Sequence, residues 1–277
     1  MDIAIIASSK DPAGKNIRNC LIESFEFEKF NETFDNNPIF KYSKIENKNI
    51  KLYLINDDLI FSESIDKKIN ADIFIFASKH RSKENTKSFA VHPIGNWSEA
   101  HFGGKEKSLC PSSAILLKNL FLGLNNEAKE SGYELTMEAT HHGPYTEKPS
   151  VFVEIGSTEE EWSDKTNGQI LAKTIMDAIG NQDKDFKIAV GIGGPHYCNN
   201  LNKVALRTDI AFSHICPKYT LEKIDEGLIQ QSIEKTPEKV DFFVLDWKGL
   251  GTEKQRIVDL LKNMDLEYKR TDQILKD

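Results

Sequence analysis

The chain has 277 residues, of which 39% are hydrophobic and 29% are charged, and its formal net charge at pH 7 is −7. A chain of this length can bury a full core, and this composition is typical of a soluble globular protein. The negative charge argues against a long non-specific nucleic-acid surface, which needs many phosphate contacts, so we expect no DNA partner. It remains compatible with a short contact to the end of an RNA.

The N-terminus and the cysteines indicate where the protein works. No apolar run approaches the roughly 18 residues of a transmembrane helix, so we expect no membrane partner. The first residues, Met-Asp-Ile-Ala-Ile-Ile, have no basic segment, which predicts a first strand rather than a signal peptide and hence a cytoplasmic protein. The 4 cysteines form no C-x-x-C pair and are expected to be reduced and mostly buried. Cys198, close after His196, stays open as a metal ligand.

Short apolar runs predict strands along the whole chain, with helical patterns between them. The predicted strands cover residues 2–7, 51–55, 72–77, 133–139, 151–155, 187–192, 209–214 and 240–245. The predicted helices cover about 14–23, a segment from 111 onwards with Ser112 as N-cap, a segment reaching about 179 behind a capping box of Thr158 and Glu161, about 220–234, and a last helix capped by Thr252 and Gln255. Residues 26–50 are polar and rich in Asn and Lys, which predicts weak structure.

This alternation of strand and helix predicts one α/β domain over residues 1–277, with a mostly parallel sheet and helices on both faces. Proteins of this class place their chemistry at the carboxyl ends of the strands. His80, His141 and His196 each follow a predicted strand. We therefore expect the loops that carry them to emerge at one edge of the sheet.

The stretch Glu138-Ala-Thr-His-His-Gly-Pro-Tyr145 places two adjacent histidines where a predicted strand ends. Adjacent strand residues point to opposite faces, so in regular β structure His141 and His142 do not both reach one ion. Either the turn at Gly143-Pro144 reorients one of them, or each serves a different site. Both interpretations stay open.

Neutral imidazoles gathered around a cavity are the ligands that zinc prefers, and zinc can keep an open position for water. We predict His80, His141, His142 and His196 as metal ligands, with His92 next. Glu154, inside an apolar run, lies either on an exposed face or paired in a site. No H-E-x-x-H or G-x-S-x-G motif is present. The residues alone thus predict a metal-assisted hydrolase of an ester, an amide or a phosphoester.

Two glycine-containing segments do not match nucleotide-binding motifs. Residues 8–16 contain only one glycine, so they do not form a P-loop. The segment around Gly193 and Gly194 is not G-x-G-x-x-G, which argues against a dinucleotide site. Its glycines are expected to let the backbone approach a ligand closely.

Several blocks of sequence together resemble a known family. They are Ser78-Lys-His80, Val91-His-Pro-Ile-Gly-Asn96, Phe102-Gly-Gly104, Glu138-Ala-Thr-His-His-Gly-Pro144, Val153-Glu-Ile-Gly-Ser157, Gly193-Gly-Pro-His-Tyr197 and Asp246-Trp-Lys-Gly249. In combination they look like the D-aminoacyl-tRNA deacylases of the archaeal and plant type. The resemblance spans nearly the whole chain, whereas each block alone would be unspecific.

The resemblance implies hydrolysis of the ester between a D-amino acid and the 3′-terminal adenosine of tRNA, a proofreading reaction with a broad amino-acid range. It also implies zinc dependence with two ions per subunit, a monomer, and a fold similar to bacterial peptidyl-tRNA hydrolase and nucleoside phosphorylases. A water on zinc, or one activated by Glu138 or a histidine such as His142, would attack the carbonyl. Metal or backbone N–H groups around Gly193 and Gly194 would stabilise the oxyanion, and Lys248 or the basic cluster of residues 79–87 would hold terminal phosphates.

Two other function classes stay open from the sequence. One is a zinc-dependent amidase or peptidyl-tRNA hydrolase on the same fold. The other is a non-catalytic module that binds tRNA or metal without turnover. The identity of the general base, the number of metals and the preferred aminoacyl groups are not fixed by the sequence.

Overall fold

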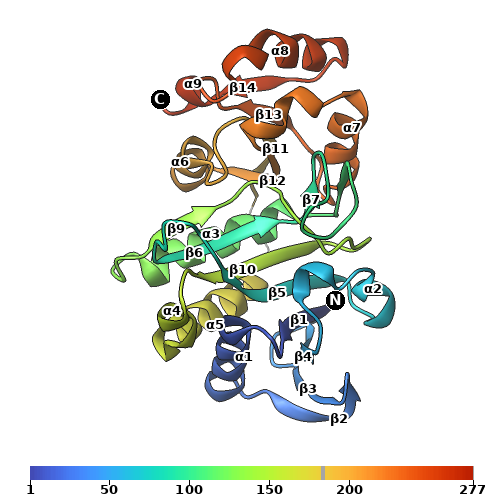
Figure 1. Ribbon diagram of the computed structural model, residues 1–277, viewed down its shortest axis with the longest axis vertical. Coiled ribbons are helices and arrows are strands. Elements are labelled where there is room, and N and C mark those ends of the chain that lie inside the picture. Colours follow the sequence, from blue (N-terminus) through green and yellow to red (C-terminus); the bar gives the residue numbers. More distant parts are fainter. Residues whose placement is uncertain (182–184, 277) are drawn as a thin grey trace.

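The computed structural model describes residues 1–181 and 185–276, and its elements form two successive layers of sheet along the long axis of the molecule (Figure 1). We call the 8-stranded sheet the main sheet and the 4-stranded sheet the second sheet. The main sheet comprises β1 (Asp2–Ser8), β2 (Glu28–Phe34), β3 (Asn37–Tyr42), β4 (Asn49–Ile55), β5 (Ile73–His80), β6 (Ser88–Pro93), β9 (Glu134–Met137) and β10 (Ser150–Gly156). The second sheet comprises β11 (Lys187–Ile192), β12 (Ile210–Cys216), β13 (Phe242–Leu245) and β14 (Tyr268–Arg270).

The main sheet has the order β2-β3-β4-β1-β5-β10-β6-β9. Its centre, from β4 through β1 and β5 to β10, is parallel. Strand β6 pairs antiparallel with β10, and β9 pairs parallel with β6. Strands β6 and β9 therefore run opposite to the central strands, and this reversal positions the site described below.

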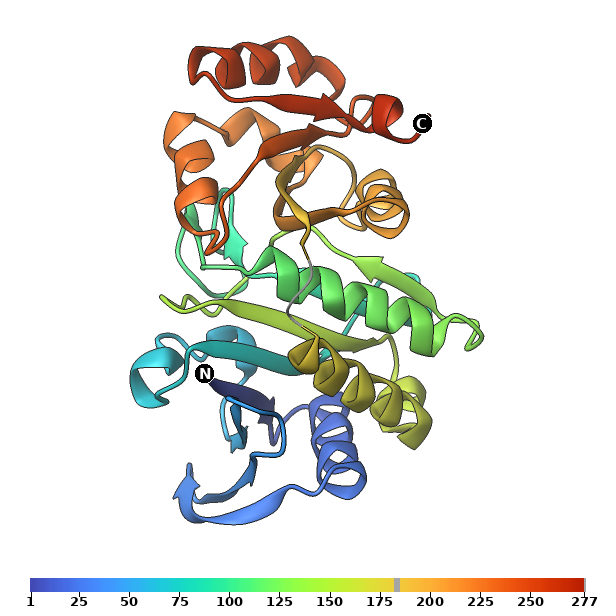
Figure 2. The ribbon, with the colours of Figure 1, turned by 180° about the vertical axis from the view of Figure 1, so that it is seen from behind.

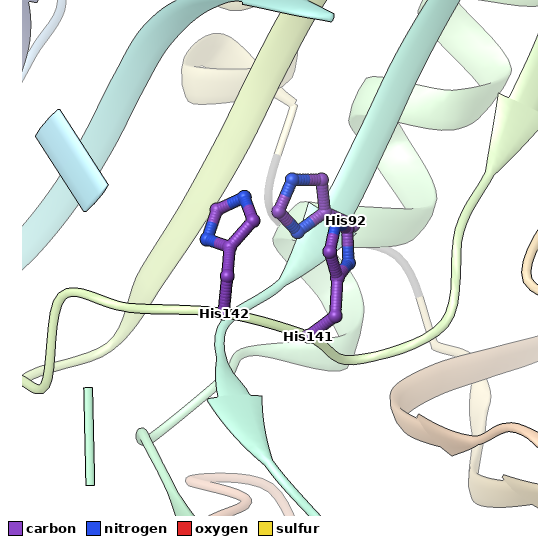
Figure 3. Close-up of side chains that lie close together, drawn as sticks. All are labelled: His92, His141 and His142. Carbon is purple, nitrogen blue, oxygen red and sulfur yellow. The ribbon is translucent and has the colours of Figure 1, made fainter. Parts of the chain in front are cut away.

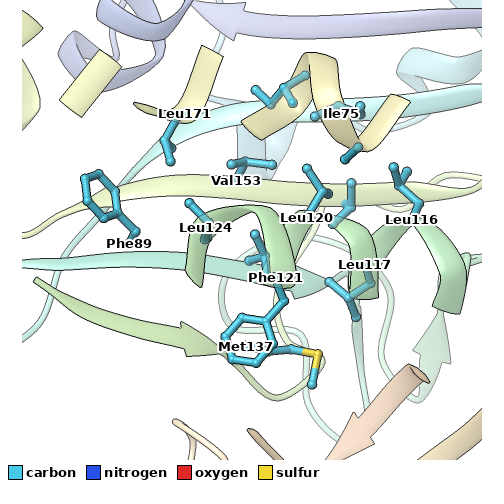
Figure 4. Close-up of a cluster of buried hydrophobic side chains, with 14 of the residues drawn as sticks. Ile75, Phe89, Leu116, Leu117, Leu120, Phe121, Leu124, Met137, Val153 and Leu171 are labelled. Atoms are coloured by element: carbon cyan, nitrogen blue, oxygen red, sulfur yellow. The ribbon is translucent and has the colours of Figure 1, made fainter. Parts of the chain in front are cut away.

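Most helices that touch the main sheet cover one of its faces (Figure 2). The helices are α1 (Pro12–Ser24), α2 (Ile65–Lys68), α3 (Ala114–Ala128), α4 (Glu159–Ser163), α5 (Lys165–Gly180), α6 (Asn199–Arg207), α7 (Glu226–Glu234), α8 (Lys254–Asn263) and α9 (Thr271–Ile274). Leucines of α3 pack on Ile75 of β5 and Val153 of β10 (Figure 4). Because strand residues alternate, Val153 faces these helices while Phe152 and Glu154 face away from them. We call this second face the site face; the short α2 covers one end of it.

The second sheet has the order β12-β11-β13-β14, is parallel throughout and carries helices on both faces. Apolar residues of α7 and α8 pack on one face and those of α6 on the other. The α6 side belongs to the same core cluster as the α3 side of the main sheet, so one continuous core joins the two sheets. A ribbon of β7 (Gly95–Asn96) and β8 (Ser108–Leu109) lies between them. In the described ranges, no helix has the length and apolar character needed to cross a membrane.

The predicted α/β class with a mostly parallel sheet is confirmed, but the strands form two large sheets rather than one, and helices cover both faces only of the second sheet. The prediction of weak structure for residues 26–50 is wrong, because β2 and β3 form an antiparallel ribbon there. Asp35 and Asn36 connect them with φ values of 51° and 64°. Both residue types tolerate positive φ, so this Asp-Asn pair is a hairpin signal that the polar composition obscured.

Several helix boundaries differ from the predictions. The N-cap of α3 is Ser113, whose hydroxyl accepts from the N–H of Leu116, and not Ser112. The capping box of Thr158 and Glu161 is confirmed, but the helix behind it is interrupted at Asp164, which caps α5 separately. The segment predicted as one helix over 220–234 is a 3-10 turn followed by α7, and the prediction of a cap at Thr252 is wrong because a 3-10 turn precedes α8.

A buried lysine joins α3 to the end of α6. Lys118 is 2% exposed, and its ammonium donates to the carbonyls of Ala205, Thr208 and Ile210. The last carbonyls of a helix lack partners within the helix and carry partial negative charge. The ammonium therefore donates to two carbonyls at the end of α6 and to one at the start of β12, and so ties both to α3.

We expect Lys118→Met to keep the packing of the aliphatic stem but to lower the free energy of unfolding by about 3 kcal/mol, because it leaves these carbonyls without a charged donor. Urea unfolding followed by circular dichroism measures this. Lys173→Met is the matched control, since Lys173 makes an exposed ion pair with Glu127 that is worth at most about 1 kcal/mol. Equal losses in the two variants would contradict the assignment.

Candidate metal and active site

Three neighbouring strands contribute side chains to the middle of the site face. Glu154 of β10 pairs in register with Ser78 of β5 and Ala90 of β6, while His80 lies opposite Gly156 and His92 lies opposite Phe152. His80 and His92 therefore flank Glu154 diagonally on one face. The Nδ1 atom of His80 is 3.2 Å from Oε2 of Glu154, and Nε2 of His92 is 3.8 Å from Oε1.

Gly156 leaves room for the His80 ring. A Cβ atom at Gly156 would lie 3.0 Å from Cδ2 of His80 and 2.6 Å from the hydroxyl of Ser88. Distances this short are not tolerated in a packed interior. The glycine thus leaves the space that the imidazole of His80 occupies beside the end of β10.

Glu138 follows β9 and connects the two sheets. Its N–H donates to the carbonyl of Val91, and two residues later the N–H of Thr140 donates to the carbonyl of Ile215 in β12. The Glu138 side chain is fully buried, and its carboxylate oxygens lie 3.5 Å from Nδ1 of His80, 3.8 Å from Nε2 of His141 and 3.2 Å from Nε2 of His196. One carboxylate thus faces imidazoles from the main sheet, from its own segment and from the loop after β11.

The expectation that His80, His141 and His196 meet at one edge of a sheet is wrong. Strand β9 runs opposite to β5, so the segment after it arrives from the other end of the strands, and His196 comes from the second sheet. The three residues do come together, but over a face of the main sheet. Apolar periodicity does not specify strand direction, which is why this geometry was not predictable from it.

His141 and His142 both turn towards His92 (Figure 3). Their ring centroids lie 4.1 Å and 4.8 Å from that of His92. His142 has a φ of 46°, so the chain has left strand geometry where the two histidines lie. Of the two interpretations left open by the sequence, the one in which backbone reorientation brings both imidazoles to one place is therefore the one observed.

Backbone carbonyls fix the tautomer of these three histidines. The Nδ1 atoms of His92, His141 and His142 lie 3.1, 2.8 and 2.6 Å from the carbonyl oxygens of Pro93, Ala139 and Gly143 respectively. A carbonyl only accepts, so each Nδ1 donates and each Nε2 keeps its lone pair. This is the pattern by which proteins orient histidines that bind a metal.

Burial and mutual proximity keep two of the histidines neutral. Burial, together with the neighbouring His92, lowers the pKa of His142 to about 3 and holds the pKa of His141 well below its usual value. For His80, burial opposes protonation, but the hydrogen bond to Glu154 and the charges of Glu138 and Glu154 outweigh it and raise the pKa to about 9. Likewise, burial opposes ionisation of Glu154, but the hydrogen bond from His80 and the proximity of the His80 and His92 rings lower its pKa.

These side chains fit a metal ion. Within the described residues, Nε2 of His92 and both carboxylate oxygens of Glu138 are buried without a hydrogen-bond partner. Three groups have donor atoms within 4.8 Å of one another: His92 with His141 and His142, Glu138 with His141 and His196, and His80 with Glu138 and Glu154. Imidazole and carboxylate donors suit zinc, and a buried orphan carboxylate needs a cation or a donor.

Two cavities open beside this cluster. The large cavity has a volume of about 610 Å³ and is lined by residues including Asp11, Phe61, Lys79, Arg81 and Glu154. The small cavity has a volume of about 380 Å³ and is lined by residues including Trp97, Glu99, Thr140, Tyr219 and Thr220. Both are lined by Phe102, His141, His142 and His196, so the histidine cluster forms the wall between them.

The other predicted site residues lie apart from this cluster. Neither cavity is lined by Gly193, Gly194 or the exposed Lys248. The N–H of Gly193 donates to the carbonyl of Cys216, so it is not free for an oxyanion. The thiol of Cys198 points to the carbonyls of Pro195 and His196 rather than into the cluster. Glu154 is a member of the cluster that the sequence left undecided; a carboxylate inside an apolar run was its signal.

The sequence and the fold are similar to those of known proteins over nearly their whole length. A family model described as D-aminoacyl-tRNA deacylase matches residues 67–269. D-aminoacyl-tRNA deacylase from Pyrococcus furiosus is 38% identical over 272 residues, covering 95% of this chain and 98% of that protein. Its counterpart from Methanosarcina barkeri is 38% identical over 283 residues, covering 98% and 90%. The crystal structure of AF0625, a conserved protein of unknown function, matches with a TM-score of 0.89 at 32% identity, covering 99% of this chain and 97% of that one.

The raised pKa of His80 gives a prediction for metal-free, chelator-treated protein. Because the folded value of about 9 exceeds the usual 6.5, protonation of His80 stabilises the folded state below about pH 6.5, and this contribution is lost as the pH rises through about 9. We expect an NMR titration of the His80 ring with a midpoint near pH 9 in the wild type and a lower midpoint in Glu154→Gln. The isosteric control Glu160→Gln, at an exposed carboxylate, should leave the midpoint unchanged. Identical midpoints in wild type and Glu154→Gln would refute the pairing.

Proposed function

Since this chain belongs to the D-aminoacyl-tRNA deacylase family, we propose that it hydrolyses the ester between a D-amino acid and the 3′-terminal adenosine of tRNA. The products are the free D-amino acid and the free tRNA. The observation that carries the proposal is the buried carboxylate of Glu138, which meets three imidazoles at the wall of an open cavity. Ester hydrolysis needs such a group to hold and deprotonate water beside the carbonyl.

We propose that the cluster binds zinc, with two ions per subunit. The group of His92, His141 and His142 and the group of His80, Glu138 and Glu154 share no residue, so both can be filled together. The Nε2 atom of His196 lies 3.2 Å from Oε2 of Glu138. His196 can therefore serve as a further ligand of the second group or lie between the two groups. When bound, zinc supplies a Lewis acid that polarises an ester carbonyl and favours deprotonation of water at neutral pH.

The residues of the chain would divide the proton transfers. Glu138 has both carboxylate oxygens inside the cluster and can accept a proton from the attacking water. His142 is neutral at physiological pH, and its Nδ1 is committed to the carbonyl of Gly143, so only Nε2 can take up a proton or bind an ion. The hydroxyl of Tyr197 lies 3.4 Å from Nε2 of His80, and the hydroxyl of Tyr219 lies 3.4 Å from Nδ1 of His196. These two contacts would orient the rings.

We also propose a broad amino-acid range, a cytoplasmic location and a monomeric state. The two adjoining cavities of about 610 and 380 Å³ support acceptance of large as well as small aminoacyl groups. The role of Lys248 in holding a phosphate, and that of Gly194 near the substrate, stay predictions.

The decisive measurement compares D-tyrosyl-tRNA with L-tyrosyl-tRNA, with and without a chelator, while circular dichroism follows the fold. We expect loss of the D-ester alone, arrest by the chelator with the fold intact, and recovery on adding zinc. No D-selective turnover with metal present would sink the deacylase proposal and point to amide substrates. Binding of tRNA with no turnover at all would identify a binding module instead.

Glu138→Gln keeps the shape of the side chain but removes its charge. We expect at least about a 100-fold loss of turnover, because the general base is gone, with less zinc per chain by elemental analysis. Glu160→Gln is the control, since the side chain of Glu160 is 82% exposed. Unchanged turnover and zinc content in Glu138→Gln, or in both His141→Ala and His196→Ala, would remove the site as drawn.

A further inference from the structure

Exposed aromatic side chains gather at the two cavities. Across residues 1–181 and 185–276, five large hydrophobic side chains are exposed, and three of them are aromatic: Phe61 at 56%, Phe102 at 66% and Tyr219 at 61%. Phe61 lines the large cavity, Tyr219 lines the small one, and Phe102 lines both. Exposed rings cost hydration free energy, so their concentration at these mouths indicates flat or apolar ligand groups.

The two cavities differ in charge. The large cavity has Lys79 and Arg81 in its lining. Its two acidic residues besides Glu154 are already engaged, because Asp58 pairs with Lys10 and Asp11 accepts from two backbone N–H groups and the Ser78 hydroxyl. Among the described residues that line the small cavity there is no lysine or arginine, whereas the exposed carboxylate of Glu99 is one of them.

An aminoacyl ester of tRNA has two chemically different halves, which match the two cavities. Its nucleotide half carries phosphates and bases, which proteins bind with basic side chains and stacked aromatic rings. Its aminoacyl half carries a cationic α-ammonium and a side chain, which suit a carboxylate and an apolar wall. The scissile bond lies between the halves, as the histidine cluster lies between the cavities.

We propose, on the basis of the proposed function, that the large cavity binds the 3′-terminal nucleotides and the small cavity binds the D-aminoacyl group. Phe61 stacks on a base, and Arg81 and Lys79 meet phosphates. Glu99 receives the α-ammonium, and Tyr219 forms the wall that the amino-acid side chain contacts. Phe102, at the boundary, is in reach of both halves.

Binding of the free trinucleotide CCA tests the nucleotide half without any turnover. Removing a stacked ring or a phosphate contact should weaken binding to metal-replete protein at least about fivefold in Phe61→Ala and in Arg81→Ala. Leu206→Ala is the control, because it removes an exposed apolar side chain of α6, away from both cavities. Equal binding by Phe61→Ala and Leu206→Ala overturns the assignment.

Turnover of D-tyrosyl-tRNA and D-alanyl-tRNA tests the aminoacyl half. Tyr219→Ala should change the ratio of the two kcat/KM values at least about fivefold, since one methylene in a pocket alone is worth about tenfold or more. Tyr219→Phe, which keeps the ring, should restore the wild-type ratio, and Phe61→Ala should lower both values equally. Glu99→Gln should reduce any preference for a free over an N-acetylated amino group.

The outcomes separate this inference from the proposed function. A wild-type protein that hydrolyses no D-aminoacyl-tRNA refutes the proposed function and the division of the substrate with it. Two results that come with normal D-specific hydrolysis refute only the division of the substrate between the cavities. They are an unchanged ratio of the two kcat/KM values in Tyr219→Ala and a changed ratio in Phe61→Ala. Either result means that the aminoacyl half does not bind in the small cavity as proposed.

Discussion

The carboxylate of Glu138 lies fully buried where the two sheets meet, and the rest of the site is arranged around it. Transfer of a carboxylate from water to a protein interior costs several kcal/mol unless opposite charge or donors surround it. The imidazole of His80, whose pKa is raised, supplies positive charge near one oxygen of this carboxylate. The neutral His141 instead turns the lone pair of its Nε2 atom towards the other oxygen, an arrangement that suits a cation between the two groups.

The reversal of β6 and β9 makes this meeting geometrically possible. If all strands ran in one direction, the segments after β5 and β9 would leave at the same edge. Because β9 runs the other way, the segment of residues 138–140 instead crosses the end of the site face. Its Thr140 N–H then donates to the carbonyl of Ile215 in β12. His92, on the other reversed strand, then lies on that face within reach of His141 and His142.

The types of the side chains predicted which residues form the site better than their expected positions at strand ends did. The apolar runs predicted most strands of both sheets, and the histidines predicted as ligands are in the cluster. The shared edge was predicted wrongly because a period of two residues is the same in parallel and antiparallel strands. The part played by Glu154 depends on which face it takes, and that is set by its register with β5 and β6, which one sequence does not encode locally. The hairpin at Asp35 and Asn36 was missed because composition was given more weight than turn chemistry.

The passage of residues 138–140 from one sheet to the other also governs when the site comes into existence during synthesis. All strands of the main sheet are complete by Gly156, but His196 and the wall around Tyr219 come from chain made later. The segment that carries the buried Glu138 carboxylate also depends on later chain. The N–H of Thr140 donates to the carbonyl of Ile215, which belongs to β12. A nascent chain therefore carries six of the seven clustered residues, all except His196, before β12 has been made to hold residues 138–140 in place.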